Sequence, residues 1–263
     1  MNPHPQSGDP GQDAPAPGSR RLAWRSAAFL AGAVALVAAT AAAAAAAASA
    51  PGDSHMTRAV SVAAGPVRTV DLEAAPGQLT IVGVAGGRVT LTGQLDWTGR
   101  APAATTQLVR GHLLRLSYRC AQASPCTANW RLVVPWRTAI ELRQPAGHVV
   151  VSGLAGPLRI TAGSVDVSAT GLRSPWLRAA ITSGHLDAAF DAPPRQVSVS
   201  LTSAQATLSL PGTTAYAVST QVTAGYVHVG IPQAASAAHT VTARVVSGEL
   251  ELLASAGHGG RRG

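Results

Sequence analysis

The stretch "TAGSVDVSA" (residues 161–169) has four counterparts further along the chain. They are "TSGHLDAAF" (182–190), "TSAQATLSL" (202–210), "TAGYVHVGI" (223–231) and "VSGELELLA" (246–254). The pattern returns after about 21 residues each time, and a near-constant period in this range is typical of chains built from stacked units. We therefore expect one supersecondary unit to be used repeatedly.

Each unit contains two short strands on either side of a tight corner. Before the corner, Val197, Val199 and Leu201 alternate with polar residues, which predicts a strand with one buried face. After it, apolar and polar residues alternate again, as in Leu186-Asp187-Ala188. One unit buries too few apolar side chains to offset its own ordering, so the units must stack on one another.

Glycine marks the corner in most units, because a sharp turn between strands often needs a positive φ angle. The expected corner positions are Gly163, Gly184, Gly225 and Gly248, with Ala204 as the exception. The fold expected from this pattern is an all-β, right-handed β-solenoid of about 21-residue coils. A twisted β-sandwich is the alternative, since regularly spaced short strands also fit that architecture.

The N-terminal region predicts the compartment. Residues 26–50 carry no charge, are long enough to cross a bilayer as one transmembrane helix, and follow Arg20, Arg21 and Arg25. The positive-inside rule then places a disordered leader, residues 1–25, in the cytoplasm and the rest of the chain outside it. A signal segment that is cleaved, giving a secreted protein, is the alternative.

The remaining chain divides by composition into three parts. Residues 51–64 are expected to be a linker, 65–254 the β-solenoid ectodomain, and 255–263 a flexible tail. The segment that begins at Arg68 is expected to cap the array. The alternating apolar residues around Cys120 and Cys126 predict a hairpin over 110–135, and outside the cytoplasm its two cysteines should form a disulfide.

The net charge of +8 raises the possibility of nucleic-acid binding, but the Arg residues are scattered rather than grouped with aromatic residues. Asp166 and Asp187 are expected at equivalent positions of adjacent coils, on an outward ladder where polar residues are normal. His148 and His185 are expected in one column with Ser164 between them, and His228 in another row. We therefore expect no catalytic residue, no cofactor and no metal site.

The segments "VVPWRTAIELRQPAGHVVVSGLAGPLRITAGSVDVSATGL" and "LPGTTAYAVSTQVTAGYVHV", together with the anchor and the cysteine-containing loop, resemble the bacterial putative-adhesin domain family. The resemblance covers about residues 65–254 and rests on spaced Gly, Val and Pro. It implies an envelope β-solenoid whose molecular function is unknown, and it carries over no catalytic residue. The Ala-rich composition without Lys resembles that of actinobacterial proteins.

Together, these features predict a non-enzymatic, single-pass protein of the cell membrane. It would act as an adhesin-like binding or scaffolding module whose partner is an envelope protein or cell-wall glycan, with no nucleic acid involved. An accessory or sensor subunit of an envelope signalling complex is the alternative, and a carbohydrate-active enzyme is a distant third.

Overall fold

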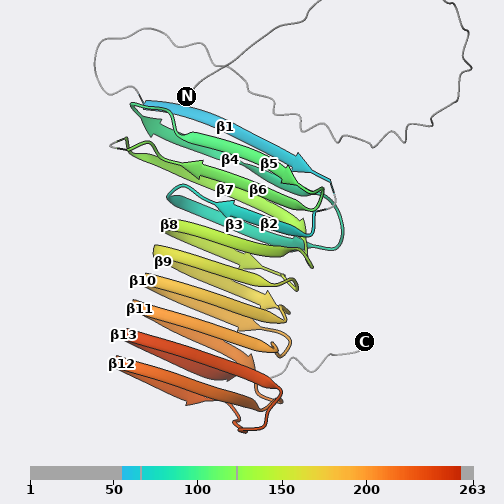
Figure 1. Ribbon diagram of the computed structural model, residues 1–263, viewed down its shortest axis with the longest axis vertical. Helices are drawn as coiled ribbons and strands as arrows, with labels where there is room; N and C mark the ends of the chain where they lie inside the picture. Colours follow the sequence, from blue (N-terminus) through green and yellow to red (C-terminus); the bar gives the residue numbers. More distant parts are fainter. Residues whose placement is uncertain (1–54, 66, 123, 256–263) are drawn as a thin grey trace, which may run out of the picture. The chain divides into compact units, whose positions relative to one another are not determined.

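The computed structural model describes residues 55–65, 67–122 and 124–255, and these form β-strands joined by short loops, without a helix. Figure 1 shows the strands lying one above another. Their bounds are β1 His55–Ala64, β2 Thr69–Glu73, β3 Gly77–Val84, β4 Val89–Thr98, β5 Ala103–Val109, β6 Leu113–Arg119, β7 Cys126–Pro135, β8 Ala139–Ser152, β9 Leu158–Leu172, β10 Trp176–Phe190, β11 Gln196–Pro211, β12 Tyr216–Gly230 and β13 His239–Ser255. The expectation of an all-β chain is confirmed for these residues.

From β8 onward, neighbouring strands are parallel and pair along nearly their whole length. Equivalent positions therefore form columns across the stack. One such column faces the interior and consists of Ile140, Leu158, Leu177, Val197, Val241 and Val218. All but the last are at most 1% exposed. Burial of each of these side chains contributes roughly 1.5–3 kcal/mol, so the columns supply most of the stabilisation.

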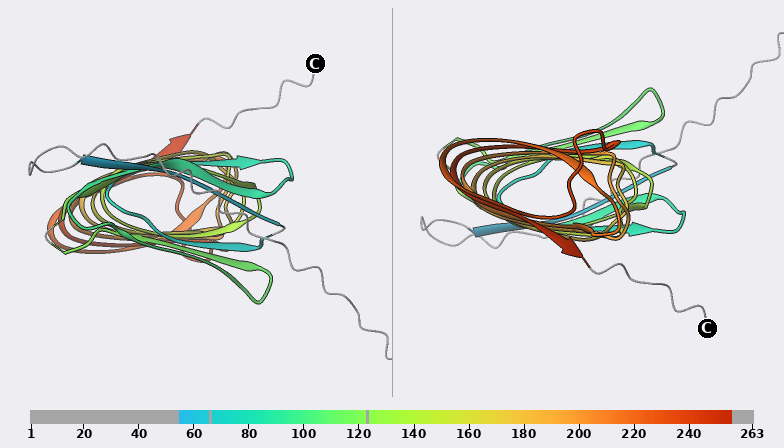
Figure 2. Two further views of the ribbon diagram at one scale, coloured as in Figure 1. Left: turned by 90° about the horizontal axis from the view of Figure 1, so that it is seen from above. Right: turned by 90° about the horizontal axis from the view of Figure 1, so that it is seen from below.

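Each long strand bends near its middle. Seen along the stack, it runs along one broad face, turns, and continues along the opposite face around a shared interior (Figure 2). Gly184, Gly225 and Gly248 lie at this turn with φ angles of 107°, 153° and 138°. Ala204 pairs with Gly184 and Gly248 at the same level, without a positive φ.

Gly163 differs from the other three predicted corner residues. Ser164 pairs with Ser183, which places Gly163 two positions before the level of Gly184. Its φ is not positive, but an added Cβ would overlap the carbonyl oxygen of Pro145. Close approach of the neighbouring backbone therefore explains this glycine. Because the offset is two residues, the side chains that point inward are unchanged.

The order of the last strands differs from the expected sequential stack, because β13 lies between β11 and β12. The apolar content of the two strands gives the reason. In β13, Ala243 and Val245 fill the interior positions and are 1% exposed. The facing positions of β12 are Thr220 and Val222, and both are exposed. The more polar strand therefore occupies the end of the stack, where one side of it has no neighbour.

The expected hairpin over 110–135 is wrong. β6 pairs with β2 and β5, whereas β7 pairs with β3 and β4, so the two strands lie on opposite faces. Their apolar residues meet across the interior instead, with the ring centroids of Tyr118 and Trp130 4.7 Å apart. The Cys120–Cys126 disulfide is present and closes the loop between the two faces.

The segment over 68–97 was expected to cap the array, and this holds for its last strand, β4, but is wrong for β2 and β3. β2 lies between β6 and β8 on one face, and β3 lies between β7 and β8 on the other. The inward residues Leu72 and Ile81 are fully buried in this position. The antiparallel pair β1–β4 and strand β5 lie beyond β7 and β6 and form this end of the stack.

The predicted leader and anchor and nearly all of the predicted tail lie outside the described residues. The prediction of a linker over 51–64 is wrong for its described part, because His55–Ala64 form β1 and pair with β4 along their whole length. Among the residues that are described, no helix is long and apolar enough to cross a membrane.

Candidate functional site

A row of paired charges crosses the face formed by β6, β2 and β8. Asp71 accepts hydrogen bonds from Arg115 Nε at 3.1 Å and from Arg143 Nη1 at 2.7 Å. Arg115 lies directly opposite Asp71 across the β2–β6 pairing. Only 8% of Asp71 is exposed, and a partly desolvated charge needs a partner of opposite sign. The two guanidinium groups provide that partner.

Glu73 forms a second pair on the same face, closer to the corner. Arg119 Nε lies 2.6 Å from its Oε1, and Ser117 Oγ donates to its Oε2 at 2.9 Å. The hydrogen bond from Arg119 holds the pKa of the Glu73 carboxyl below its ordinary value, and this effect outweighs the opposing effect of burial. The carboxylate therefore stays charged well into the acidic range.

We expect Glu73→Gln to lower the free energy of unfolding by about 1 kcal/mol at neutral pH, the upper end for a partly exposed pair. Because the folded-state pKa of Glu73 is lowered, its contribution is full above the unfolded-state pKa and is lost as the pH falls through the folded-state value. Urea titrations from pH 7 to pH 3 should show the two proteins converging at the acidic end. Glu251→Gln, which removes a carboxylate with no ion pair among the described residues, is the control. A difference that persists unchanged at pH 3 would rule out the charge as its cause.

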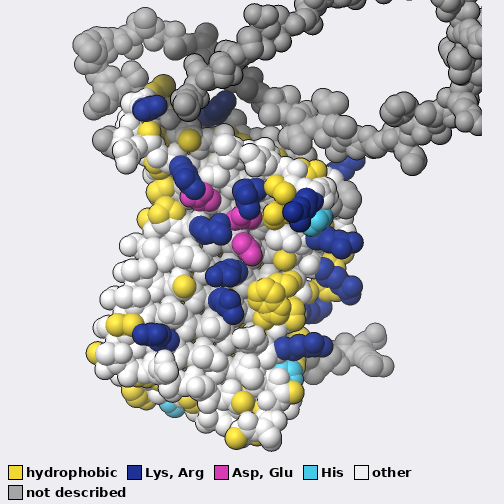
Figure 3. Space-filling model, in the orientation of Figure 1, with side chains coloured by type: hydrophobic (Ala, Val, Ile, Leu, Met, Phe, Trp, Pro, Cys, Tyr) yellow, Lys and Arg dark blue, Asp and Glu magenta, His cyan; other side chains and the backbone are white. Residues whose placement is uncertain are grey.

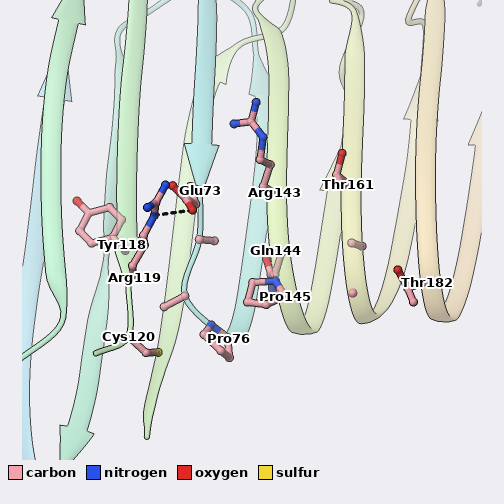
Figure 4. A pocket seen from close by; sticks show the side chains of 14 residues that line it. Glu73, Pro76, Tyr118, Arg119, Cys120, Arg143, Gln144, Pro145, Thr161 and Thr182 are labelled. Atoms are coloured by element: carbon pink, nitrogen blue, oxygen red, sulfur yellow. Dashed lines mark ion pairs between the residues drawn. The ribbon is translucent and has the colours of Figure 1, made fainter. Parts of the chain in front are cut away.

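Next to these pairs, a hollow of about 500 Å³ opens where β2 ends and the chain turns toward β3 (Figure 4). Its floor is apolar, and Glu73, Arg119 and Arg143 lie at its rim. The lining residues are Glu73, Ala74, Ala75, Pro76, Tyr118, Arg119, Cys120, Arg143, Gln144, Pro145, Thr161, Ala162, Gly163 and Thr182. Its volume falls in the range of small-molecule and side-chain pockets.

Gln144 is the buried polar residue of this hollow. It lies at an inward position, 3% exposed, opposite Ala162 of β9. Its Nε2 donates to the carbonyl oxygens of Gly77 at 2.9 Å and Ala146 at 3.2 Å, which ties the corner of β8 to the start of β3. Its Oε1 has no hydrogen-bond partner among the described residues. A buried acceptor without a partner is unusual, and because this atom has almost no accessible surface, a donor would reach it only if neighbouring side chains moved.

The site combines an apolar floor, a charged rim and, buried beside them, an amide oxygen without a partner. Such a lining suits an apolar group that carries a hydrogen-bond donor, such as a tyrosine or tryptophan side chain. Tyr118, whose pKa is raised by burial, contributes its ring to the wall. Nothing in the lining has the arrangement of a nucleophile beside a general base.

Sequence reasoning singled out Cys120 and Gly163, which line this site, as a disulfide and a corner residue, but it did not single out the charged residues or Gln144. The signal was present in the outward positions of "VDLE", "LRLSYR" and "IELRQ", where acidic and basic residues lie on strands that turn out to be neighbours. This signal could not be used from the sequence alone. About 44 residues separate β2 from β6, and the periodicity does not predict that the two strands pair.

The predicted polar ladder on the opposite face has a different composition from the one expected. Asp166, not Ser164, lies between His148 and His185. Its carboxylate is 3.4 Å from His148 Nε2 and 3.2 Å from His185 Nδ1. Asp187 lies opposite Ser168 and is therefore not level with Asp166. Across the described residues, no group of three His, Cys, Asp or Glu side chains has an arrangement that could hold a metal ion.

Comparisons with known proteins give only distant likenesses. No model of a known protein family matches the chain, and no curated protein matches it. A solved structure described as a "putative cell adhesion protein" from Clostridium sporogenes is 12% identical, with a TM-score of 0.47, and the match covers 78% of this chain and 100% of that one. A "putative adhesin" from Bacteroides fragilis is 11% identical, with a TM-score of 0.42, covering 77% and 99%. At this level, the properties of those proteins do not transfer to this chain.

Proposed function

We propose that this protein is a non-catalytic, adhesin-like binding or scaffolding module of the cell envelope. In this proposal, residues 26–50 anchor it in the membrane and the described residues lie outside the cytoplasm. The architecture we infer is a right-handed β-solenoid, and it is supported by parallel neighbours at offsets of 18 to 23 residues in β8–β10, β11 and β12–β13. The disulfide agrees with an oxidising compartment.

The observation that carries this proposal is the hollow beside the ion-paired face. The hollow is pre-formed, because its walls belong to β2, β6, β8 and β9, whose inward side chains are buried in one core. Its apolar floor can receive a side chain of a partner. The charged rim can orient that partner.

The test is retention of the partner by the full chain, purified in detergent. The chain is immobilised and exposed to purified cell-wall glycan and, separately, to a detergent extract of the source membrane. We expect one envelope protein to be retained. Thr182→Trp, which places a large ring at the rim of the hollow, should reduce retention at least about tenfold, because burial of the partner's side chain is lost.

Thr202→Trp is the matched control, since Thr202 occupies the same position in β11 but does not line the hollow. This variant should bind as the native chain does. If neither fraction contains a retained component, or if the Thr182 variant binds as well as the control, the hollow is not the binding site and the proposal fails.

A further inference from the structure

A second surface, which adjoins the hollow on the same face, is strongly basic. It lies along the edge where the strands of the stack begin and end, and Figure 3 shows Arg side chains gathered along one side of the molecule there. All of the Arg side chains on this surface are exposed. Those in loops are Arg68, Arg110, Arg137, Arg173 and Arg195, and those near the start of a strand are Arg159 and Arg178.

Two of these residues lie directly beside each other. Arg159 of β9 pairs with Arg178 of β10, so two positive charges are neighbours on one face. The adjacent carboxylate, Glu141, lies 3.9 Å from Arg143 instead. Among the described residues, neither Arg159 nor Arg178 forms an ion pair. Like charges directly opposite each other destabilise a sheet, and the one carboxylate in register with the pair, Glu141 opposite Arg159, makes its ion pair with Arg143.

An exposed aromatic ring adjoins the pair. Trp176 lies two residues before Arg178, on the same side of the strand, and 44% of it is exposed. The amide of Arg195 donates to the carbonyl oxygen of Pro175 at 2.7 Å, which holds that loop next to Trp176. Further along the edge, the guanidinium of Arg137 lies 5.3 Å from the centroid of the Trp136 ring. Basic and aromatic groups thus occur together at two levels of the stack.

We propose that this edge, which we call the Arg–Trp edge (Arg137, Arg159, Trp176, Arg178 and Arg195), binds an extended polymer of sugars and phosphates. The planar fork of Arg matches two oxygens of a phosphate, and Arg159 and Arg178 together receive one or two such groups. The flat apolar face of Trp176 receives a sugar ring. Strands about 4.8 Å apart place these groups in a line along the stack, which suits a chain-like ligand better than a flat membrane.

This proposal concerns residues that do not line the hollow, and it rests on the proposed function only for the envelope location. Its test uses the full chain in detergent and a soluble poly(glycerol phosphate) that carries sugar substituents. We expect affinity to fall roughly 10- to 100-fold between 50 and 200 mM salt, as a few phosphate contacts require. Dextran, which has sugars without phosphate, should not bind.

The decisive variant is Arg159→Ser with Arg178→Ser, since Ser198 already occupies the next position of the same row. Affinity for the polymer should fall at least about tenfold. The thermal midpoint should stay the same or rise, because the repulsion between the two charges is removed. The matched control is Arg131→Thr with Arg244→Ser, which removes the same charge away from the edge and should change affinity less than about twofold.

Trp176→Gln distinguishes the contribution of the sugar to the binding affinity from that of the phosphate. It should weaken binding of the substituted polymer and leave inorganic polyphosphate unaffected. If the two double variants lose the same affinity for the polymer, binding depends only on net charge, and the proposal is overturned. Phosphatidylglycerol vesicles or single-stranded DNA that bind more tightly than the polymer would also overturn it. Capture of an envelope protein through the hollow, unaffected by the edge variants, would leave the proposed function standing while this inference failed.

Discussion

Val199→Asp is expected to unfold the protein. Val199 lies in the middle of an inward column, between Ala179 of β10 and Ala243 of β13, and is 2% exposed. The substitution removes an apolar contact and buries an unpaired carboxylate, and together these should cost at least about 4 kcal/mol. A domain of ordinary stability, about 5–15 kcal/mol, would lose most or all of its margin. Circular dichroism during a thermal scan measures this directly.

Ser198→Asp is the control for that experiment. Ser198 is the preceding residue and points outward, between Arg178 and Thr242 of the neighbouring strands. A carboxylate there remains in contact with water and lies beside a guanidinium, so the free energy of unfolding should change by no more than about 0.5 kcal/mol. Equal tolerance of both substitutions would show that the interior side of β11 has been assigned wrongly.

The second large effect is expected at a corner. Gly248 has a φ of 138°, and an added Cβ would overlap the carbonyl oxygen of Ala204 in the neighbouring strand. Gly248→Ala therefore combines backbone strain with a steric clash between two β-strands. We expect a loss of about 3 kcal/mol or more in the free energy of unfolding, measured by urea denaturation.

Two other glycines separate these causes. Gly86 has a φ of 74° with nothing within 4 Å of an added Cβ, so Gly86→Ala should cost only about 1 kcal/mol of strain. Gly163 has no positive φ, but its Cβ would overlap the carbonyl oxygen of Pro145, so Gly163→Ala tests the clash alone. If all three variants lose the same amount, close packing at the corner is not what requires glycine at Gly248.

Local periodicity predicted much of the fold. The alternation around Val197 and Leu201 predicted inward positions that are fully buried. Spaced glycines predicted the turns at Gly184, Gly225 and Gly248. These features depend on residues close together in the chain, where side-chain direction and backbone sterics decide the result.

The order of the strands could not be predicted in the same way. Two strands with the same period can exchange places in a stack, and the difference between β12 and β13 lies in how much apolar surface each can bury. The candidate site also depends on a strand order that the period does not predict. Glu73 reaches Arg119 only because β2 lies beside β6. The inward position of Gln144 could not be predicted either, because the alternation that predicts the core assigns apolar residues to inward positions.

The rows of outward side chains depend on the strand order, in which β13 lies between β11 and β12. Cysteine cross-linking tests it most directly. Ser200 of β11 lies opposite Arg244 of β13, and Gln221 of β12 lies one strand further on. Oxidation should join Ser200→Cys to Arg244→Cys and leave Ser200→Cys and Gln221→Cys unlinked, because two strand spacings exceed the reach of a disulfide. A chain in which the second pair links and the first does not would have its strands stacked in sequence order, and would contradict the account.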